Sequence, residues 1–117
     1  MTEKIHKDYI QDIVDAIAEI EFFVKDMAFP DFIEDRKTVN AVIRSLEVLG
    51  EATKNIPDII RNQYPEIPWN KMAGMRDKLI HEYFGVDLET VWQTIQEDLP
   101  KLKPFIINLQ EHLRTEA

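Results

Sequence analysis

The chain has 117 residues, which is enough for one compact domain and too few for two. Hydrophobic residues make up 44% of the sequence, so a core can form and disorder is not expected. Cysteine is absent, which excludes disulfides and thiolate zinc sites. The formal net charge of −8 argues against broad binding of nucleic acid, because such binding normally rests on a basic footprint.

The first half of the chain carries a helical pattern. Apolar residues at alternating spacings of three and four predict an amphipathic helix over roughly residues 4–27. Pro30 predicts its end, since proline disfavours helix at the preceding residue. A second helix is expected over 35–55, and Pro57 is suited to begin a short helix through Tyr64. The two apolar stripes consist of Ile10, Ile13, Ile17, Ile20, Val24 and Met27, and of Val39, Val42, Leu46, Leu49 and Ala52.

The second half continues in the same way. Two prolines within residues 64–69 predict a loop, followed by a helix over about 70–83 with Gly85 as a plausible C-terminal cap. Asp87 is expected to cap a last helix that runs to the end of the chain. Because Pro100 deletes a backbone donor inside that run, a break or kink is expected near Leu99, and Pro104 falls in the same run. The prediction is one all-α domain over 1–117, an up-and-down bundle of four main helices plus a short one.

The residues with the clearest chemical potential are Arg76, His81 and Tyr83, spaced Arg-x4-His-x-Tyr. An imidazole moves protons near neutral pH, and a guanidinium stabilises charge on phosphoryl oxygens, so the pair can cut a phosphodiester without metal. The spacing alone is common, and cations near a helix C-terminus are unremarkable. On an ideal helix Arg76 and Tyr83 lie about 20° apart, whereas His81 lies about 140° from Arg76. Either the helix unwinds before His81, or a second copy completes the site across a two-fold axis, which we favour.

A polar stripe on the second helix is a further candidate. Arg44, Glu47, Glu51 and Lys54 repeat at spacings of three, four and three. As an exposed face with mixed ion pairs the stripe would contribute only tenths of a kcal/mol, about 0.2–0.5 per pair. Alternatively, it forms a polar wall beside the Arg76/His81 pocket. The exposed face is the preferred interpretation for Lys54, and both interpretations stay open for the other three.

Other signals are weaker. Trp69 and Trp92 are expected to be core or interface anchors rather than platforms for base stacking. His6 and His112 are expected to be solvent-exposed, and neither has neighbours at convincing metal-ligand spacing. No phosphate-binding glycine loop or nucleophile elbow occurs, so neither a metal nor a cofactor is predicted. The lack of a membrane-length or signal-type apolar run, with the lack of cysteine, predicts a cytoplasmic protein with no membrane partner.

The chain resembles the HepT branch of the HEPN domains. The resemblance lies in residues 67–87, which contain the Arg-x4-His-x-Tyr motif, in Val91-Trp92, and in the upstream run 44–52. It covers most of the chain in order and implies a single HEPN-like helical domain. Proteins of this kind are toxins of type VII-like toxin–antitoxin pairs.

The resemblance implies metal-independent RNA cleavage in a homodimer, with Arg76 and His81 as the catalytic pair. It implies a minimal nucleotidyltransferase as the partner, which uses ATP to transfer AMP to Tyr83 and so silences the toxin. Asp77 is assigned to a pocket that supports the catalytic pair. The same pocket includes Arg44, Glu47 and Glu51, the three residues of the polar stripe for which both interpretations stay open.

A non-catalytic protein is the alternative. Some HEPN-like domains bind nucleotides or dimerise with nucleotidyltransferases, and Arg76 and His81 would then hold a phosphate. The intact pair favours the enzyme, whereas the net acidity favours the binding module.

Overall fold

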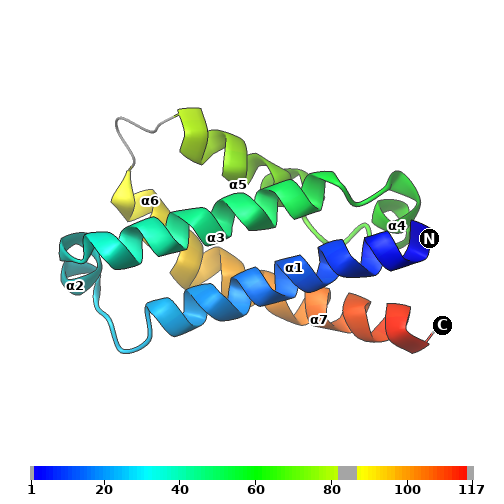
Figure 1. Cartoon of the computed structure of the whole chain (residues 1–117), viewed down its shortest axis with the longest axis horizontal. Coiled ribbons are helices and arrows are strands. Elements are labelled where there is room, and N and C mark those ends of the chain that lie inside the picture. Colours follow the sequence, from blue (N-terminus) through cyan, green and yellow to red (C-terminus); the bar gives the residue numbers. More distant parts are fainter. Residues whose placement is uncertain (1, 82–86, 116–117) are drawn as a thin grey trace.

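The computed structural model describes residues 2–81 and 87–115, with side chains for 6–75 and 87–115. Over this part of the chain the structure is helical and contains no strand. Figure 1 shows the long helices running alternately up and down, with both termini at the same end. The predicted all-α bundle is therefore confirmed. The helical segments are α1 (Thr2–Phe23), α2 (Phe29–Glu34), α3 (Arg36–Lys54), α4 (Asp58–Gln63), α5 (Trp69–His81), α6 (Leu88–Gln93), a π-helical segment (Thr94–Asp98) and α7 (Leu99–Thr115).

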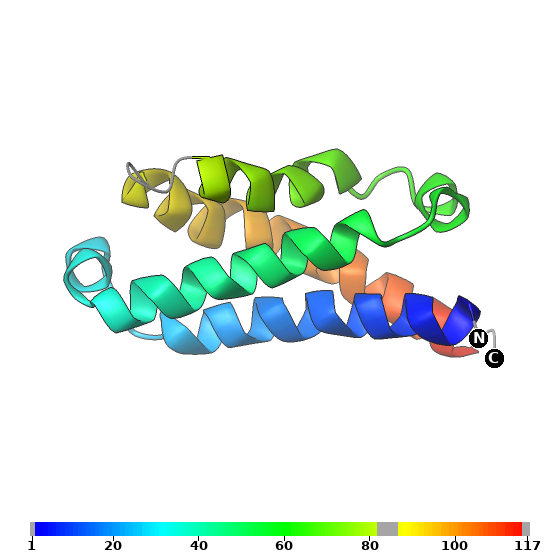
Figure 2. The same ribbon diagram turned by 45° about the horizontal axis from the view of Figure 1, so that its top comes forward.

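The core follows from the two predicted stripes. The α3 helix packs against both α1 and α5, and α1 also packs against α7, as the two ribbon views agree (Figures 1 and 2). Every predicted apolar position of the α3 stripe is buried, and so is the α1 stripe except Met27, which is half-buried in the turn after the helix. None of the helices among the described residues has the length and apolar character to cross a bilayer.

The end of the first helix differs from the prediction. The α1 helix stops at Phe23, and Asp26 adopts a left-handed conformation with φ of 64° in the turn that follows. Asp tolerates this conformation better than most residues. Pro30 does not end a helix; it lies in the first turn of α2, where its missing N–H costs nothing. The Oδ2 atom of Asp31 accepts a hydrogen bond from the Ala28 backbone N–H at 2.9 Å and stabilises that start.

The last helix is interrupted where the prolines predict it. Asp87 caps α6, its Oδ1 accepting from the backbone N–H groups of Glu89 and Thr90 at 3.0 and 3.3 Å, as predicted. The π-helical segment then precedes Pro100, and the Leu99 N–H bonds to the carbonyl of Thr94, five residues back. The π-helical turn contains one residue more than an α-helical turn, and this accommodates Pro100, which has no backbone N–H to donate.

Candidate functional site

The start of α5 is tied firmly to the end of α3. Trp69 is buried, and its Nε1–H donates to the Tyr64 carbonyl at 3.0 Å. The guanidinium of Arg61 lies 6.0 Å from the centre of the Trp69 ring. The same guanidinium donates to the carbonyls of Thr53 at 2.7 Å and Ile56 at 3.0 Å, at the C-terminal end of α3. The expectation that Trp69 is an anchor is confirmed, and Arg61 is the link that fixes where α5 begins.

Replacing Arg61 by Ala is therefore expected to destabilise the fold. Hydrogen bonds from a charged donor are each worth about 1.5–3 kcal/mol, and their loss would leave two carbonyls at a helix end without these partners. For a domain of this size the loss of both hydrogen bonds corresponds to a fall in Tm of roughly 10–25 °C, measured by thermal unfolding followed by circular dichroism. Arg114→Ala is the matched control, since Arg114 is exposed on α7 and lies in an exposed ion pair with Glu111 at 3.5 Å. Equal Tm values for the two variants would contradict the anchoring role of Arg61.

The α5 backbone carries both members of the predicted catalytic pair. It is helical through His81, so the described backbone does not unwind to bring positions 76 and 81 onto one stripe. Position 76 follows one turn after Met72, which is fully buried, and position 81 lies two turns after Gly74. The side chains of Arg76, Asp77 and His81 lie outside the described residues, as does Tyr83 altogether. Their assigned roles remain predictions.

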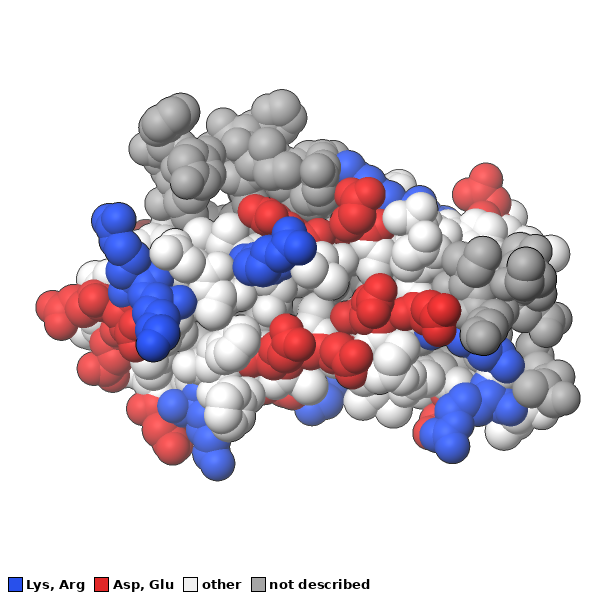
Figure 3. Space-filling model, in the orientation of Figure 1, with Lys and Arg blue, Asp and Glu red and all other residues white. Residues whose placement is uncertain are grey.

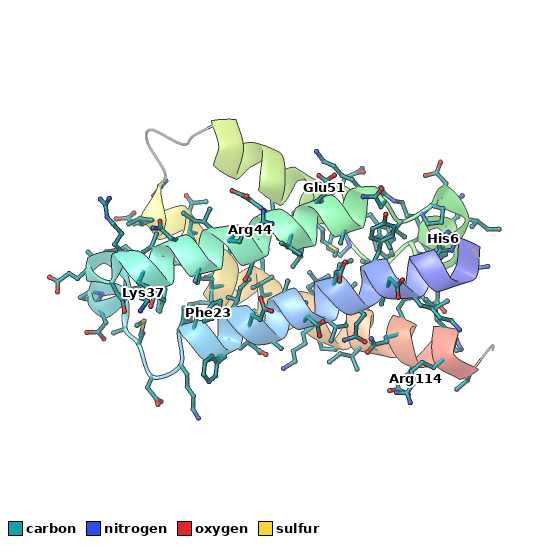
Figure 4. The ribbon with its side chains drawn as sticks, viewed as in Figure 1. His6, Phe23, Lys37, Arg44, Glu51 and Arg114 are labelled. Atoms are coloured by element: carbon teal, nitrogen blue, oxygen red, sulfur yellow. The ribbon has the colours of Figure 1, made fainter. Side chains whose placement is uncertain are left out.

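The polar stripe of α3 lines one hollow. Arg44, Glu47 and Glu51 share a cavity of about 280 Å³ with Tyr9 and Asp12 of α1. Arg44 Nη1 lies 3.6 Å from Glu47 Oε2 in a largely exposed ion pair. Figure 4 shows Arg44 and Glu51 projecting from the middle and the C-terminal part of α3. The structure brings the three predicted pocket residues together in a hollow whose second wall is α1.

The surface beside this hollow is acidic. Asp8, Asp12, Asp15 and Glu19 are exposed along α1 at helical spacing, and acidic side chains cross this face in Figure 3. Partial burial, followed by the neighbouring carboxylates of Asp15 and Asp8, raises the pKa of Asp12 above its ordinary value. A face with this charge repels a phosphate backbone and suits a basic protein surface.

A second hollow lies between α5 and α6 with its π-helical extension. Its volume is about 320 Å³. Sequence reasoning missed it, although two signals were present: a glycine inside α5, and polar residues at helical spacing after Asp87. The residues that line it are Lys71, Gly74, Met75, Thr90, Gln93, Thr94, Glu97 and Asp98.

Histidines outside α5 offer no metal site. Among the described residues no group of three His, Asp or Glu side chains is placed to hold a metal ion. Exposed His112 is hydrogen-bonded through Nδ1 to the Tyr64 hydroxyl at 2.8 Å, so it helps to fix the α4–α5 loop to α7. His6 is half-buried on α1, rather than exposed as expected.

Comparison with known proteins finds relatives that are named as ribonucleases. The profile of a family described as "Ribonuclease HepT-like" matches residues 13–109. The protein named "Probable ribonuclease HepT" from Thermococcus cleftensis is 55% identical over 101 residues, covering 86% of this chain and 92% of the relative. A protein of Caldanaerobacter subterraneus, named as a candidate RNase, is 44% identical over 103 residues, covering 86% of this chain and 89% of the relative. No solved structure matches the chain.

Proposed function

The chain belongs to the HepT-like ribonuclease family, and from that premise we propose that it is the toxin of a two-gene toxin–antitoxin pair that cleaves RNA without metal. The observation that carries the proposal is the intact Arg-x4-His-x-Tyr motif within the matched residues. The names of its relatives support a ribonuclease. The expected site of action is the cytoplasm.

The proposed chemistry needs only protein side chains and the RNA itself. His81 performs one of the two proton transfers, taking the proton from a ribose 2′-hydroxyl or giving one to the leaving 5′-oxygen, and water carries the other. The 2′-oxygen attacks phosphorus, and the bond from phosphorus to the 5′-oxygen breaks. Arg76 stabilises the negative charge that builds on the phosphoryl oxygens. The products are a 2′,3′-cyclic phosphate and a 5′-hydroxyl.

The active form is proposed to be a homodimer. Because α5 is helical through His81, positions 76 and 81 of one copy diverge by about 140° and do not address one phosphate easily. A two-fold axis beside α5 would let Arg76 of one copy meet His81 of the other. The acidic face formed by α1 stays available for a partner protein.

A complementation experiment tests this arrangement. Arg76→Ala and His81→Ala proteins are each expected to be inactive, whereas an equimolar mixture allowed to exchange subunits should regain RNA cleavage. In the mixed dimers, about half of the total, one copy supplies an arginine and the other a histidine. Light scattering should give the mass of a dimer for wild type. A monomeric mass at all concentrations, or a mixture as inactive as its components, would contradict the shared site.

Silencing is proposed to be covalent. The partner, a minimal nucleotidyltransferase, would use ATP to transfer AMP to the Tyr83 oxygen. The added phosphate charge would repel the RNA backbone and could pair with Arg76. ATP is thus the substrate of the partner, and the chain itself needs no cofactor.

The acidity of the chain supports one other candidate function, a non-catalytic partner of a nucleotidyltransferase. With a net charge of −8 and an acidic α1 face, the protein is better suited to a basic protein than to a nucleic acid. In that case Arg76 and His81 would only hold a phosphate, and neither the wild type nor the mixture in the experiment above would cleave RNA.

A further inference from the structure

The hollow between α5 and α6 is a groove with an open floor. Figure 2 shows α6 beside the C-terminal half of α5. Gly74 lies in the wall of the groove that α5 forms, and a Cβ atom built on Gly74 would meet no described atom within 4 Å. Glycine inside a helix lowers helix stability relative to alanine. Packing among the described residues does not require a glycine at this position, so in the described part of the chain the space above Gly74 is open.

The opposite wall of the groove carries hydrogen-bond acceptors. Glu97 is exposed, and its Oε2 accepts from Gln93 Nε2 at 3.0 Å. Asp98 Oδ1 lies 3.0 Å from Nζ of Lys71, which reaches across from α5. Each carboxylate can accept further hydrogen bonds beyond the one it makes here. Among the described lining residues, two carboxylates face one lysine, which disfavours a phosphate and favours a neutral group that donates hydrogen bonds.

Along α5, Gly74 in the groove wall and position 81 of the proposed catalytic pair lie on the same side of the helix. Positions 74 and 81 are seven residues apart and therefore lie about 20° apart on the helix, on one stripe. The distance along the helix axis is about 10 Å. A group seated over Gly74 would thus belong to a nucleotide close to the bond that His81 acts on.

We propose that this groove binds a nucleobase of the RNA strand beside the cleaved bond, and that it prefers a base with an exocyclic amine over uracil. The inference rests on the proposed function, because the strand is its substrate. The flat base lies over Gly74, and its amine donates to Glu97, as carboxylates accept from cytosine N4 elsewhere. The sugar and phosphates stay outside, away from the carboxylates.

The test measures binding without cleavage. The dimer is titrated into fluorescent oligodeoxycytidine or oligodeoxyuridine, and binding is followed by fluorescence anisotropy. Both strands lack the 2′-hydroxyl and therefore cannot be cleaved by the proposed reaction. Wild type is expected to bind the cytidine strand about tenfold more tightly, the size of one hydrogen-bonded discrimination. Gly74→Leu should fill the groove and remove that preference. Gly74→Ala should raise the Tm, yet weaken binding of the cytidine strand severalfold. Ala18→Leu, at an exposed position of α1, is the control and should bind as wild type.

Four outcomes would overturn the groove assignment. They are no binding of either strand by wild type, equal binding of both strands, Gly74 variants that bind as wild type, and cytidine monophosphate alone binding as tightly as the strand. Loss of the dimer in Gly74→Leu, seen by light scattering, would assign the groove to a second copy instead. Cleavage of the matching ribo-oligonucleotides is measured in parallel. If wild type cleaves RNA without a base preference, the ribonuclease function is supported and the groove assignment is wrong. If wild type prefers the cytidine strand but does not cleave RNA, the groove assignment is supported and the ribonuclease function is wrong.

Discussion

RNA cleavage is expected to fall by a factor on the order of 10²–10⁴ in both Arg76→Ala and His81→Ala, and growth inhibition should disappear with it. His81 supplies the proton transfer, and Arg76 the charge that the transition state needs, so neither loss is compensated by the remaining residue. The measurement is single-turnover cleavage of a labelled RNA by each purified homodimer, together with growth curves after induction.

Matched controls separate chemistry from folding. Arg114→Ala and His112→Ala remove the same residue types from exposed positions on α7 and should keep wild-type cleavage. All four variants should retain the helical circular dichroism of wild type. A folded Arg76→Ala or His81→Ala protein that cleaves at the wild-type rate would show that the residue has no catalytic role.

Tyr83→Phe is expected to remain toxic in the presence of its partner. Phenylalanine lacks the oxygen that accepts AMP, so co-expression with the neighbouring nucleotidyltransferase should silence wild type and leave the variant active. Peptide mass spectrometry of the silenced wild type should place one AMP on Tyr83. Tyr64→Phe, at the C-terminal end of α4, is the matched control and should be silenced normally.

Two results would count against covalent control through Tyr83. One is silencing of Tyr83→Phe as efficient as that of wild type. The other is an unmodified Tyr83 in silenced protein. Either result would make simple masking of the site by the partner the better explanation.

Periodicity was enough to predict the main helices and their buried faces. The stripes of α1 and α3 predicted the core because long amphipathic helices have few other ways to bury their apolar residues. Asp87 and Pro100 marked local events that depend on single residues, a cap and a missing donor. The turn at Asp26 and the start of α2 at Pro30 were not predicted, because both residues suit more than one local structure.

The candidate site was also predicted only in part from the sequence. The motif Arg76–Tyr83 is contiguous in sequence and could be recognised there, together with the stripe that contains Arg44 and Glu47. The groove over Gly74 was not predicted, since a glycine and spaced polar residues do not show that Thr90–Asp98 is folded against α5. Its chemistry depends on side chains that lie far apart in the chain, such as Lys71 and Asp98.

Cleavage of RNA by the purified, unmodified protein in excess EDTA tests the central claim most directly. The claim predicts full activity under these conditions and a 2′,3′-cyclic phosphate at the new end, because His81 and Arg76 do the chemistry without a metal ion. An RNA that stays intact in EDTA, in the presence of folded dimer carrying no AMP, would contradict it.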